Sequence, residues 1–247
     1  MSKNIFLTGT AGSGKSNLTG ILSNWYQQEG RDVITVNLDP GVSNVPYGID
    51  VDIRNYINLN EIMDKYNLGP NGSLILASDL IATKLEQIEE EIDEYNPDYV
   101  FIDTPGQIEL FAYRNSGPYF IKNIRNEANV NLFLFDSTLV SDPSNFLSIA
   151  LLASSIKLRL GIPQVSILTK KDLIKDDQAR ILKWADDFSE LLDDLNEGGE
   201  IYDLTSRMAE SVVESNIIDE LIPTSTIDNE GIVEVIASIS RIIDRGE

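Results

Sequence analysis

The 247-residue sequence contains no cysteine and no histidine. Without cysteine, disulfides and cysteine-ligated zinc sites are excluded. Without histidine, the chain cannot form a histidine-containing catalytic triad, a histidine general base or a histidine-ligated metal centre. Any catalysis must therefore rely on carboxylates, amides, hydroxyls, lysine, arginine, backbone groups or a hard metal ion.

Positive charge is also scarce, because 19 lysine and arginine residues stand against 40 aspartate and glutamate residues. The resulting net charge of −21 disfavours non-specific binding to nucleic acid or to an anionic membrane. The acidic residues are dispersed along helical patterns such as Lys84–Asn96. This pattern is typical of a solvated surface, with a docking surface for a basic partner as the alternative.

Long hydrophobic runs are missing as well. No segment approaches the run of about 18 uncharged apolar residues that a transmembrane helix requires. The N-terminus leads directly into a glycine-rich motif and lacks the apolar segment and cleavage site of a secretory signal. We therefore expect no membrane association and a cytoplasmic location.

Apolar, β-rich segments alternate with helical patterns along the chain. The predicted strands are Asn4–Gly9, Asp32–Asp39, Asp98–Gly106, Val130–Asp136, Gln164–Lys170 and Glu220–Ser225. The predicted helices are Lys15–Glu29, Ser78–Tyr95 (with Ser78 or Asp79 as N-cap), Pro143–Leu160, Asp177–Leu195, Ile201–Ser215 and Gly231–Asp244. Near-continuous apolar strands that alternate with helices predict one α/β domain over residues 1–247, with a three-layer, doubly wound, mainly parallel sheet. Because a helix lies between the second and third strands, these two are predicted to be parallel.

The segment GTAGSGKS, Gly9–Ser16, fits the pattern G-x-x-x-x-G-K-[S/T] between a predicted strand and a predicted helix. In such a P-loop, glycines let backbone N–H groups surround phosphates, and the helix N-terminus adds partial positive charge. Lys15 is predicted to reach the β- and γ-phosphates, and Ser16 to hold Mg²⁺. The motif indicates a P-loop nucleoside triphosphatase fold with helical insertions. The predicted phosphate-binding residues are Gly12, Ser13, Gly14, Lys15, Ser16 and Asn17.

Two further segments follow predicted strands and are expected beside the P-loop. Asp103, in DTPGQIE, is predicted to lie in the Mg²⁺ shell, and Gly106 to donate its backbone N–H to the γ-phosphate. Gln107 could orient water. Asp39, in NLDPG, stands where a side chain can face the phosphate crevice outside the carboxyl end of its strand.

The segment TKKD, Thr169–Asp172, is similar to the guanine-recognising [N/T]-K-x-D element. Asp172 would accept from both N–H donors on the Watson–Crick edge of guanine, and the Lys170 stem would cover the base plane. Thr169 stands where asparagine is more common. In the later loop TSTIDNEG, the backbone N–H groups of Ser225 and Thr226 would contact guanine O6.

These segments, together with GPNG at Gly69–Gly72, resemble the GPN-loop GTPases over nearly the whole chain and in the order of that family. The resemblance implies the dimeric nucleotide-switch branch of P-loop proteins, as a homodimer or heterodimer. It also implies that Gly69, Pro70 and Asn71 of each subunit enter the active site of the other. From turn chemistry, GPNG is predicted to be a turn, because proline presets φ and Asn-Gly tolerates positive φ.

The reaction that the resemblance implies is hydrolysis of GTP to GDP and phosphate. By the family pattern, Asp39 and Gln107 would orient or polarise the attacking water, with Glu109 nearby. Asn71 of the partner would present its amide to the phosphate end. No arginine finger is apparent; Arg54 and Arg114 are the candidates, and each is equally explained as a surface arginine.

The biological client is not revealed by the residues. Eukaryotic members of the family are linked to RNA polymerase assembly and nuclear import, which implies an RNA polymerase-related client. The short C-terminus and the absence of cysteine suit an archaeal-type member instead. Three alternatives stay open: an ATPase of the same branch, a nucleotide-dependent assembly scaffold that does not turn its nucleotide over, and a small-molecule kinase.

Overall fold

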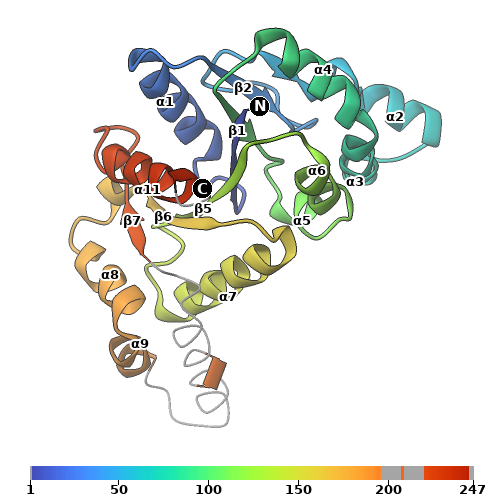
Figure 1. The fold of residues 1–247 in the computed structure, drawn as a ribbon. Helices are drawn as coiled ribbons and strands as arrows, with labels where there is room; N and C mark the ends of the chain where they lie inside the picture. The colour runs from blue at the N-terminus through green and yellow to red at the C-terminus, as the bar shows by residue number, and fades with distance from the viewer. Residues whose placement is uncertain (1, 196–206, 209–219, 245–247) are drawn as a thin grey trace.

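The computed structural model describes residues 2–195, 207–208 and 220–244 (Figure 1). In this part of the chain, seven strands form one sheet in the order β3-β2-β4-β1-β5-β6-β7, and every neighbouring pair is parallel. This arrangement confirms the predicted P-loop nucleoside triphosphatase fold. The strands are β1 (Lys3–Gly9), β2 (Val33–Asn37), β3 (Val51–Asp52), β4 (Tyr99–Asp103), β5 (Ala128–Asp136), β6 (Gln164–Thr169) and β7 (Leu221–Pro223).

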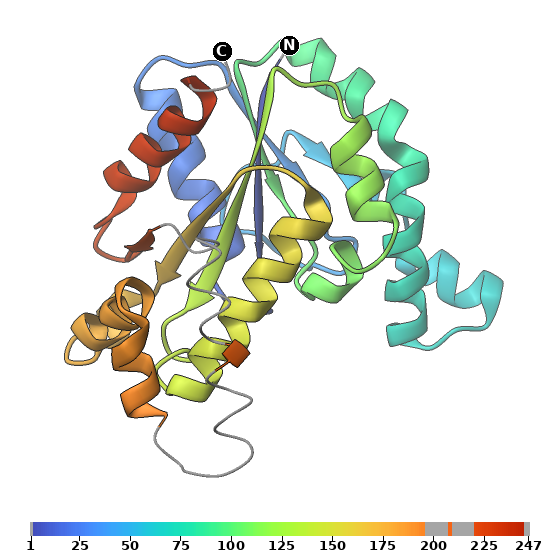
Figure 2. The same ribbon diagram turned by 60° about the horizontal axis from the view of Figure 1, so that its bottom comes forward.

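Helices cover both faces of the sheet, as Figures 1 and 2 show. Helices α1 (Lys15–Gln28) and α11 (Ile232–Asp244) lie on one face; α4 (Leu85–Tyr95), α6 (Ser116–Asn123) and α7 (Pro143–Leu160) lie on the other. The remaining helices are α2 (Leu59–Tyr66), α3 (Pro70–Leu80), α5 (Ile108–Phe111), α8 (Gln178–Asp186) and α9 (Phe188–Asp194), with 3₁₀ turns η1 (Ile53–Asn55), η2 (Ile81–Lys84) and η3 (Lys171–Leu173).

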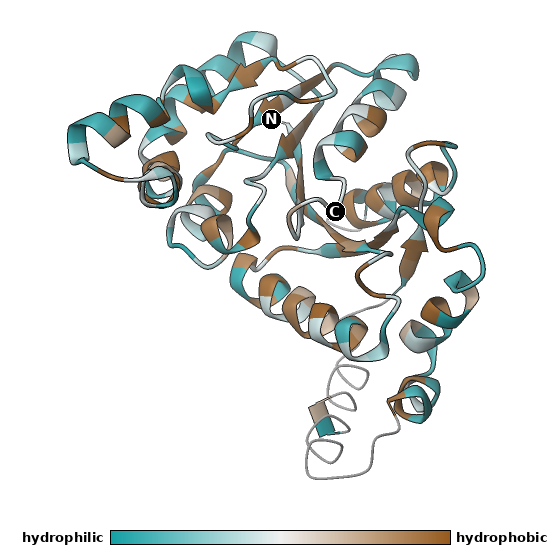
Figure 3. Ribbon diagram, turned by 180° about the vertical axis from the view of Figure 1, so that it is seen from behind, coloured by the Kyte–Doolittle hydropathy of each residue, from teal (hydrophilic) through white to brown (hydrophobic). Residues whose placement is uncertain are grey.

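The two hydrophobic clusters follow from the two-residue period of the strands. In β1, Ile5 and Leu7 pack with α1 and α11, whereas Phe6 between them packs into the cluster of the opposite face. All three are fully buried. Hydrophobic residues accordingly run along the strands in Figure 3, and hydrophilic residues dominate much of α2 and α4.

The six predicted strands all exist, with ends within three residues of the expected ones. The parallel pairing of β2 with β4 confirms the predicted crossover. Strand β3 was not predicted. It is only two residues long, which is too short for a two-residue hydrophobic period to be recognised.

Two predicted helices were wrong in their bounds. Helical structure begins at Pro70 rather than Ser78, so Ser78 and Asp79 lie inside α3 and neither is an N-cap. The Ser78 hydroxyl donates to the Leu74 carbonyl one turn earlier. The predicted helix Asp177–Leu195 divides at Asp187, whose side chain caps α9 by accepting from the Ser189 N–H. The predicted helix Ile201–Ser215 lies outside the described residues, apart from 207–208.

The prediction of a turn at GPNG was also wrong, because this tetrapeptide starts helix α3. Gly69 is the N-cap and Pro70 is the first helical residue. Proline is favoured there because the N–H that it lacks would have no partner inside the helix. The reversal lies earlier, at Asn67, whose left-handed φ of 51° ends α2.

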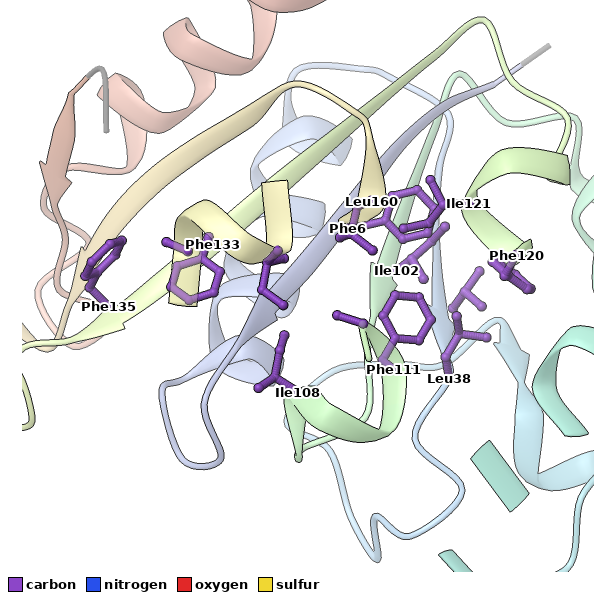
Figure 4. Packing of buried hydrophobic residues seen from close by; sticks show 14 of the residues in the cluster. Phe6, Leu38, Ile102, Ile108, Phe111, Phe120, Ile121, Phe133, Phe135 and Leu160 are labelled. Atoms are coloured by element: carbon purple, nitrogen blue, oxygen red, sulfur yellow. The ribbon is translucent and has the colours of Figure 1, made fainter. Parts of the chain in front are cut away.

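The segments that follow β2 and β4 are anchored in one hydrophobic cluster. Leu38, directly after β2, lies in the same cluster as Ile108 and Phe111 of α5, and all three are buried. Figure 4 shows Phe111 beside Leu38 and near Phe120. The core therefore fixes Leu38, which precedes Asp39, and Ile108, which follows Gly106 by two residues, while Asp39 and Gly106 themselves line a cavity.

Candidate functional site

The predicted site residues follow the carboxyl ends of the strands. Gly9 ends β1 and opens the P-loop, Asp103 ends β4, and Thr169 ends β6. Asp39 comes two residues after β2, and Ser225 two residues after β7. Because all strands are parallel, these ends meet at one edge of the sheet, which is where ligands bind in open α/β sheets.

A cavity of about 310 Å³ opens over the P-loop. Gly12 and Gly14 have left-handed φ values of 78° and 96°, which only glycine adopts readily. Ser13 is fully buried beneath the loop, and its hydroxyl has no hydrogen-bond partner among the described residues. The residues that line the cavity are Gly12, Gly14, Lys15, Ser16, Asn17, Asp39, Val42, Asp103, Thr104 and Gly106.

Lys15 is one of the residues that line this cavity. Its Nζ donates to the carbonyls of Gly9 and Thr10 at 3.0 Å and of Gly106 at 3.2 Å. Burial lowers the pKa of Lys15, and the carboxylates of Asp103, Asp39 and Glu109 oppose that effect in that order. The site therefore holds a buried cation that is surrounded by acceptors and suited to an anionic ligand.

The Asp103 carboxylate is almost fully buried beside the P-loop helix, with 2% of the residue exposed. Its Oδ2 accepts a hydrogen bond from the Tyr47 hydroxyl at 3.1 Å. Burial raises the pKa of Asp103, and this outweighs the opposing effects of the Ser16 hydroxyl, the Lys15 ammonium and the Tyr47 hydroxyl. The Oδ1 atom is buried and has no hydrogen-bond partner in the described part of the chain.

These donor atoms fit Mg²⁺. The unpartnered Oδ1 of Asp103 and the hydroxyl of Ser16 are hard oxygen ligands, which Mg²⁺ prefers. Across residues 2–195, 207–208 and 220–244, no group of three or more acidic side chains is placed to hold a metal alone. With one carboxylate and one hydroxyl from this chain, a Mg²⁺ ion would take its remaining oxygen ligands from a bound phosphate or from water.

Asp39 joins the two segments that follow β2 and β4. Its Oδ2 accepts from the Gly106 N–H at 2.8 Å, and its Oδ1 accepts from the Gly41 N–H at 2.8 Å. Gln107 is the N-cap of α5 and is exposed next to this contact. Glu109, in the first turn of α5, is exposed and lies near enough to affect the pKa of Lys15.

The TKKD segment is connected directly to the P-loop. The Thr169 hydroxyl donates to the Ser13 carbonyl at 2.8 Å, so threonine links the two motifs across the sheet edge. Lys170 has a left-handed φ of 59°, and its Nζ contacts Asp136 Oδ2 at 2.6 Å. Asp172, within η3, is partly exposed.

The loop after β7 packs against TKKD. The Lys171 N–H donates to the Thr224 carbonyl at 3.1 Å, and the Lys171 ammonium pairs with Glu230 at 2.7 Å. The Ser225 N–H, predicted to contact guanine O6, donates to the Glu230 carbonyl at 3.0 Å, so this donor is already used within the loop. Thr226 is the partly exposed residue that follows.

The Gly-Pro-Asn residues lie apart from this cavity. Gly69, Pro70 and Asn71 are exposed, and among the described residues of their own chain they do not line the cavity over the P-loop. Helix α3 nevertheless touches the Asp39 loop, because a Cβ on Gly41 would lie 2.6 Å from Leu74 Cδ2.

Neither candidate for an arginine finger extends freely. Arg54 forms a bidentate pair with Asp52, from Nε to Oδ1 and from Nη2 to Oδ2, and donates to the carbonyls of Val42 and Ser43 at 3.0 and 3.2 Å. Arg114 forms a bidentate pair with Asp79 of α3. Both guanidinium groups therefore hold segments of this chain together.

Sequence reasoning missed two residues of the site, Tyr47 and Asp136. Asp136 ends a predicted strand, so the rule that functional residues follow carboxyl strand ends could have found it. Tyr47 lies in a loop and contacts a residue 56 positions away in the chain. No local pattern indicates such a contact.

The parallel sheet, the P-loop with its buried Lys15 and the aspartate at the end of the neighbouring strand β4 define a P-loop nucleoside triphosphatase fold. Residues 7–245 match a protein family described as "Conserved hypothetical ATP binding protein". Relatives that share 38% and 31% identity with this chain are named GPN-loop GTPase 3, and the chain belongs to the GPN-loop GTPase family.

One relative is GPN-loop GTPase 3 of Kluyveromyces lactis, 38% identical over 175 residues, which cover 70% of this chain and 65% of the relative. GPN-loop GTPase 3 of Dictyostelium discoideum is 31% identical and covers 100% of this chain and 89% of its own length. A GTPase from Pyrococcus abyssi, crystallised in its apo form, superimposes with a TM-score of 0.85 at 27% identity and 97% coverage of both chains. The chain thus spans about 65% of the K. lactis relative.

In the described residues, no helix has the length and apolar character needed to cross a membrane.

Proposed function

We propose that this protein binds GTP with Mg²⁺ and hydrolyses it to GDP and phosphate. The observation that carries the proposal is the convergence of Lys15, Asp39, Asp103 and Gly106 on one cavity over the P-loop. These residues come from three strand ends and supply a cation, two carboxylates and a backbone donor. Phosphoryl transfer needs positioning and charge stabilisation of this kind more than covalent chemistry.

In the proposed reaction, water attacks the γ-phosphorus and the bond from that phosphorus to the β–γ bridging oxygen breaks. Lys15 would exchange its carbonyl contacts for phosphate oxygens and stabilise their charge. Asp39 and Gln107 would orient the attacking water, with Glu109 beside them. Glycine at 106 allows the backbone to approach the γ-phosphate without a side chain in the way.

Ser16 and Asp103 would hold Mg²⁺, directly or through water. The bound ion would neutralise charge on the phosphate oxygens. The assignment is supported by the unpartnered Oδ1 of Asp103 and by the absence of histidine and cysteine, which leaves only hard oxygen ligands.

A nucleotide-dependent switch is part of the proposal. The Gly106 N–H is bonded to Asp39 Oδ2, so it can donate to a γ-phosphate only after that hydrogen bond opens. Opening it changes both segments that Asp39 joins, residues 41–54 and residues 105–115. Such γ-phosphate-dependent ordering of loops is a common switch mechanism.

Dimer formation, with Asn71 acting across the interface, completes the proposal. It is supported by the exposure of Gly69, Pro70 and Asn71 and by their absence from the lining of the described cavity of their own chain. The first turn of a helix also leaves backbone N–H groups without partners, which favours contact with phosphate. Because α3 touches Gly41 through Leu74, the same helix would contact the Asp39 loop of its own subunit.

The choice of guanine over adenine is the feature that separates this proposal from an ATPase. Wild-type protein is expected to bind a non-hydrolysable GTP analogue more tightly than the ATP analogue and to release phosphate from GTP. Asp172→Asn exchanges an acceptor for a donor. It should weaken guanine nucleotide binding about 10- to 100-fold, the order for one lost pairing in a binding site, and should favour xanthine nucleotides.

Asp176→Asn makes the same substitution at a nearby exposed aspartate and should leave all affinities unchanged. Calorimetric titration and phosphate-release assays measure these outcomes. Equal affinity of the wild-type protein for the GTP and ATP analogues would contradict guanine selection. Tight GTP binding without phosphate release would favour a scaffold that does not turn the nucleotide over.

A further inference from the structure

Tyr47 lies in the loop between β2 and β3 and reaches across to β4. Its hydroxyl donates to Asp103 Oδ2 at 3.1 Å, since a phenol at neutral pH carries its proton. The Cβ of Tyr47 packs against helix α1, because a Cβ added to Gly20 would lie only 3.2 Å from it. The ring is therefore held between the P-loop helix and the carboxylate that follows β4.

The two carboxylate oxygens of Asp103 have different surroundings. Oδ2 is occupied by Tyr47, whereas Oδ1 is buried and has no hydrogen-bond partner among the described residues. A buried acceptor is rarely left unsatisfied in a protein, so an unpartnered one indicates a missing ligand, ion or water. The hydrogen bond to Oδ2 restrains rotation of the carboxylate, and Asp103 is one of the residues that line the cavity over the P-loop.

We propose that Tyr47 is a positioning residue for Mg²⁺: its hydroxyl holds Asp103 so that Oδ1 serves the metal shell. The inference rests on the proposed Mg²⁺ site at Ser16 and Asp103. It adds that the site is completed by the 41–54 segment, whose beginning Arg54 anchors through the Val42 and Ser43 carbonyls. Metal affinity then depends on a residue in a loop that is expected to move with the nucleotide state.

Tyr47→Phe removes one oxygen and keeps the ring and its packing against Gly20. Tyr56→Phe is the matched control, because the Tyr56 hydroxyl donates to the Glu91 carboxylate of α4 at 2.6 Å, outside the residues that line the cavity. Mn²⁺ serves as a spectroscopically visible probe in place of Mg²⁺. Electron paramagnetic resonance then measures the Mn²⁺ affinity of each protein saturated with GDP, with GDP alone as the reference.

Tyr47→Phe should weaken Mn²⁺ binding to the GDP complex about 10-fold, the order expected for loss of one hydrogen bond to a charged group. Tyr56→Phe should match the wild-type protein. GDP affinity in excess EDTA, and the midpoint of thermal unfolding at saturating GDP in EDTA, should be the same for both variants to within a few-fold and a few degrees. A purely structural role of Tyr47 would instead weaken GDP binding with and without metal.

Wild-type or tighter Mn²⁺ affinity in Tyr47→Phe would overturn the inference; the tighter result would show that the hydroxyl competes with the metal. A metal-independent loss of GDP affinity would overturn it as well. Asp103→Asn tests the underlying site separately. If the wild-type protein binds no Mn²⁺ beyond that held by GDP, or if Asp103→Asn binds it as tightly as wild type, the proposed Mg²⁺ site itself fails.

Discussion

Asp136 ends β5, and its carboxylate contacts Thr138 and Lys170. Its Oδ2 pairs with Lys170 Nζ at 2.6 Å, and its Oδ1 accepts from the N–H and the hydroxyl of Thr138 at 3.1 and 2.8 Å. Lys170 is the residue whose stem is predicted to cover the guanine plane. A flexible lysine chain is costly to order, so a fixed ammonium should stabilise the bound base.

Asp136→Asn keeps an oxygen for Thr138 and removes the charge that holds Lys170. We expect the Kd values of GTP and GDP to rise about 10-fold, because a hydrogen-bonded pair of charges at a partly buried site is lost. Calorimetric titration measures this change. Asp142→Asn, at the N-cap of α7, is the control and should leave nucleotide affinity unchanged. An unaltered Kd in Asp136→Asn would show that the Lys170 position does not depend on the ion pair.

At the scale of elements, the hydrogen bond from the Gly106 N–H to Asp39 Oδ2 connects the loop after β2 to the start of α5. Each side is anchored by buried residues, Leu38 on one and Ile108 on the other. The loops can therefore change while their anchors stay in the core. We therefore expect motion within residues 41–54 and 105–115, around buried residues such as Ile108 that stay in the core.

Hydrogen exchange should detect that motion. Amides in residues 41–54 and 105–115, Gly106 above all, should exchange at different rates in the GDP complex and in the complex with a non-hydrolysable GTP analogue. The interior of α7, Pro143–Leu160, should exchange equally in both and serves as the internal control. Indistinguishable exchange in the two loops at saturating nucleotide would argue strongly against a switch.

At the scale of the whole molecule, the exposed Gly-Pro-Asn residues predict that the catalytic unit is a dimer. Asn71→Ala should keep near-normal GTP affinity and slow hydrolysis about 10²-fold, the usual order for one lost transition-state donor. Asn60→Ala, at another exposed asparagine on α2, should hydrolyse GTP at the wild-type rate. Steady-state phosphate release measures both.

Mixing Asn71→Ala with Lys15→Ala distinguishes action across the interface from action within one subunit. In a mixed dimer, one site combines an intact Lys15 with the intact Asn71 of the other subunit. At equal amounts and random pairing, activity should recover to about a quarter of wild type, because half the dimers are mixed and each has one complete site. With subunit exchange verified, a mixture that stays inactive would refute action in trans.

Six of the seven strands in the described residues, their parallel direction and the sheet edge where the motifs meet could be predicted from the sequence. Apolar strands reveal themselves through a local pattern, and the P-loop through residues adjacent in the chain, such as Gly14, Lys15 and Ser16. Strand polarity placed Asp103 at the same edge of the sheet as the P-loop, and the pairing of β4 with β1 makes the two neighbours. These features depend on the period of apolar residues and on motifs of neighbouring residues, both of which can be recognised in the sequence.

The side chains that complete the site become known only from long-range contacts in the folded protein. The contacts of Tyr47 with Asp103 and of Asp136 with Lys170 join residues 56 and 34 positions apart. No spacing pattern in the sequence predicts either contact. The start of α3 at Pro70 was likewise misjudged, because the Gly-Pro-Asn-Gly segment suits both a turn and a helix N-terminus. Local chemistry permitted both conformations, and the structure resolves the choice in favour of the helix, whose Ala77 and Ser78 are buried.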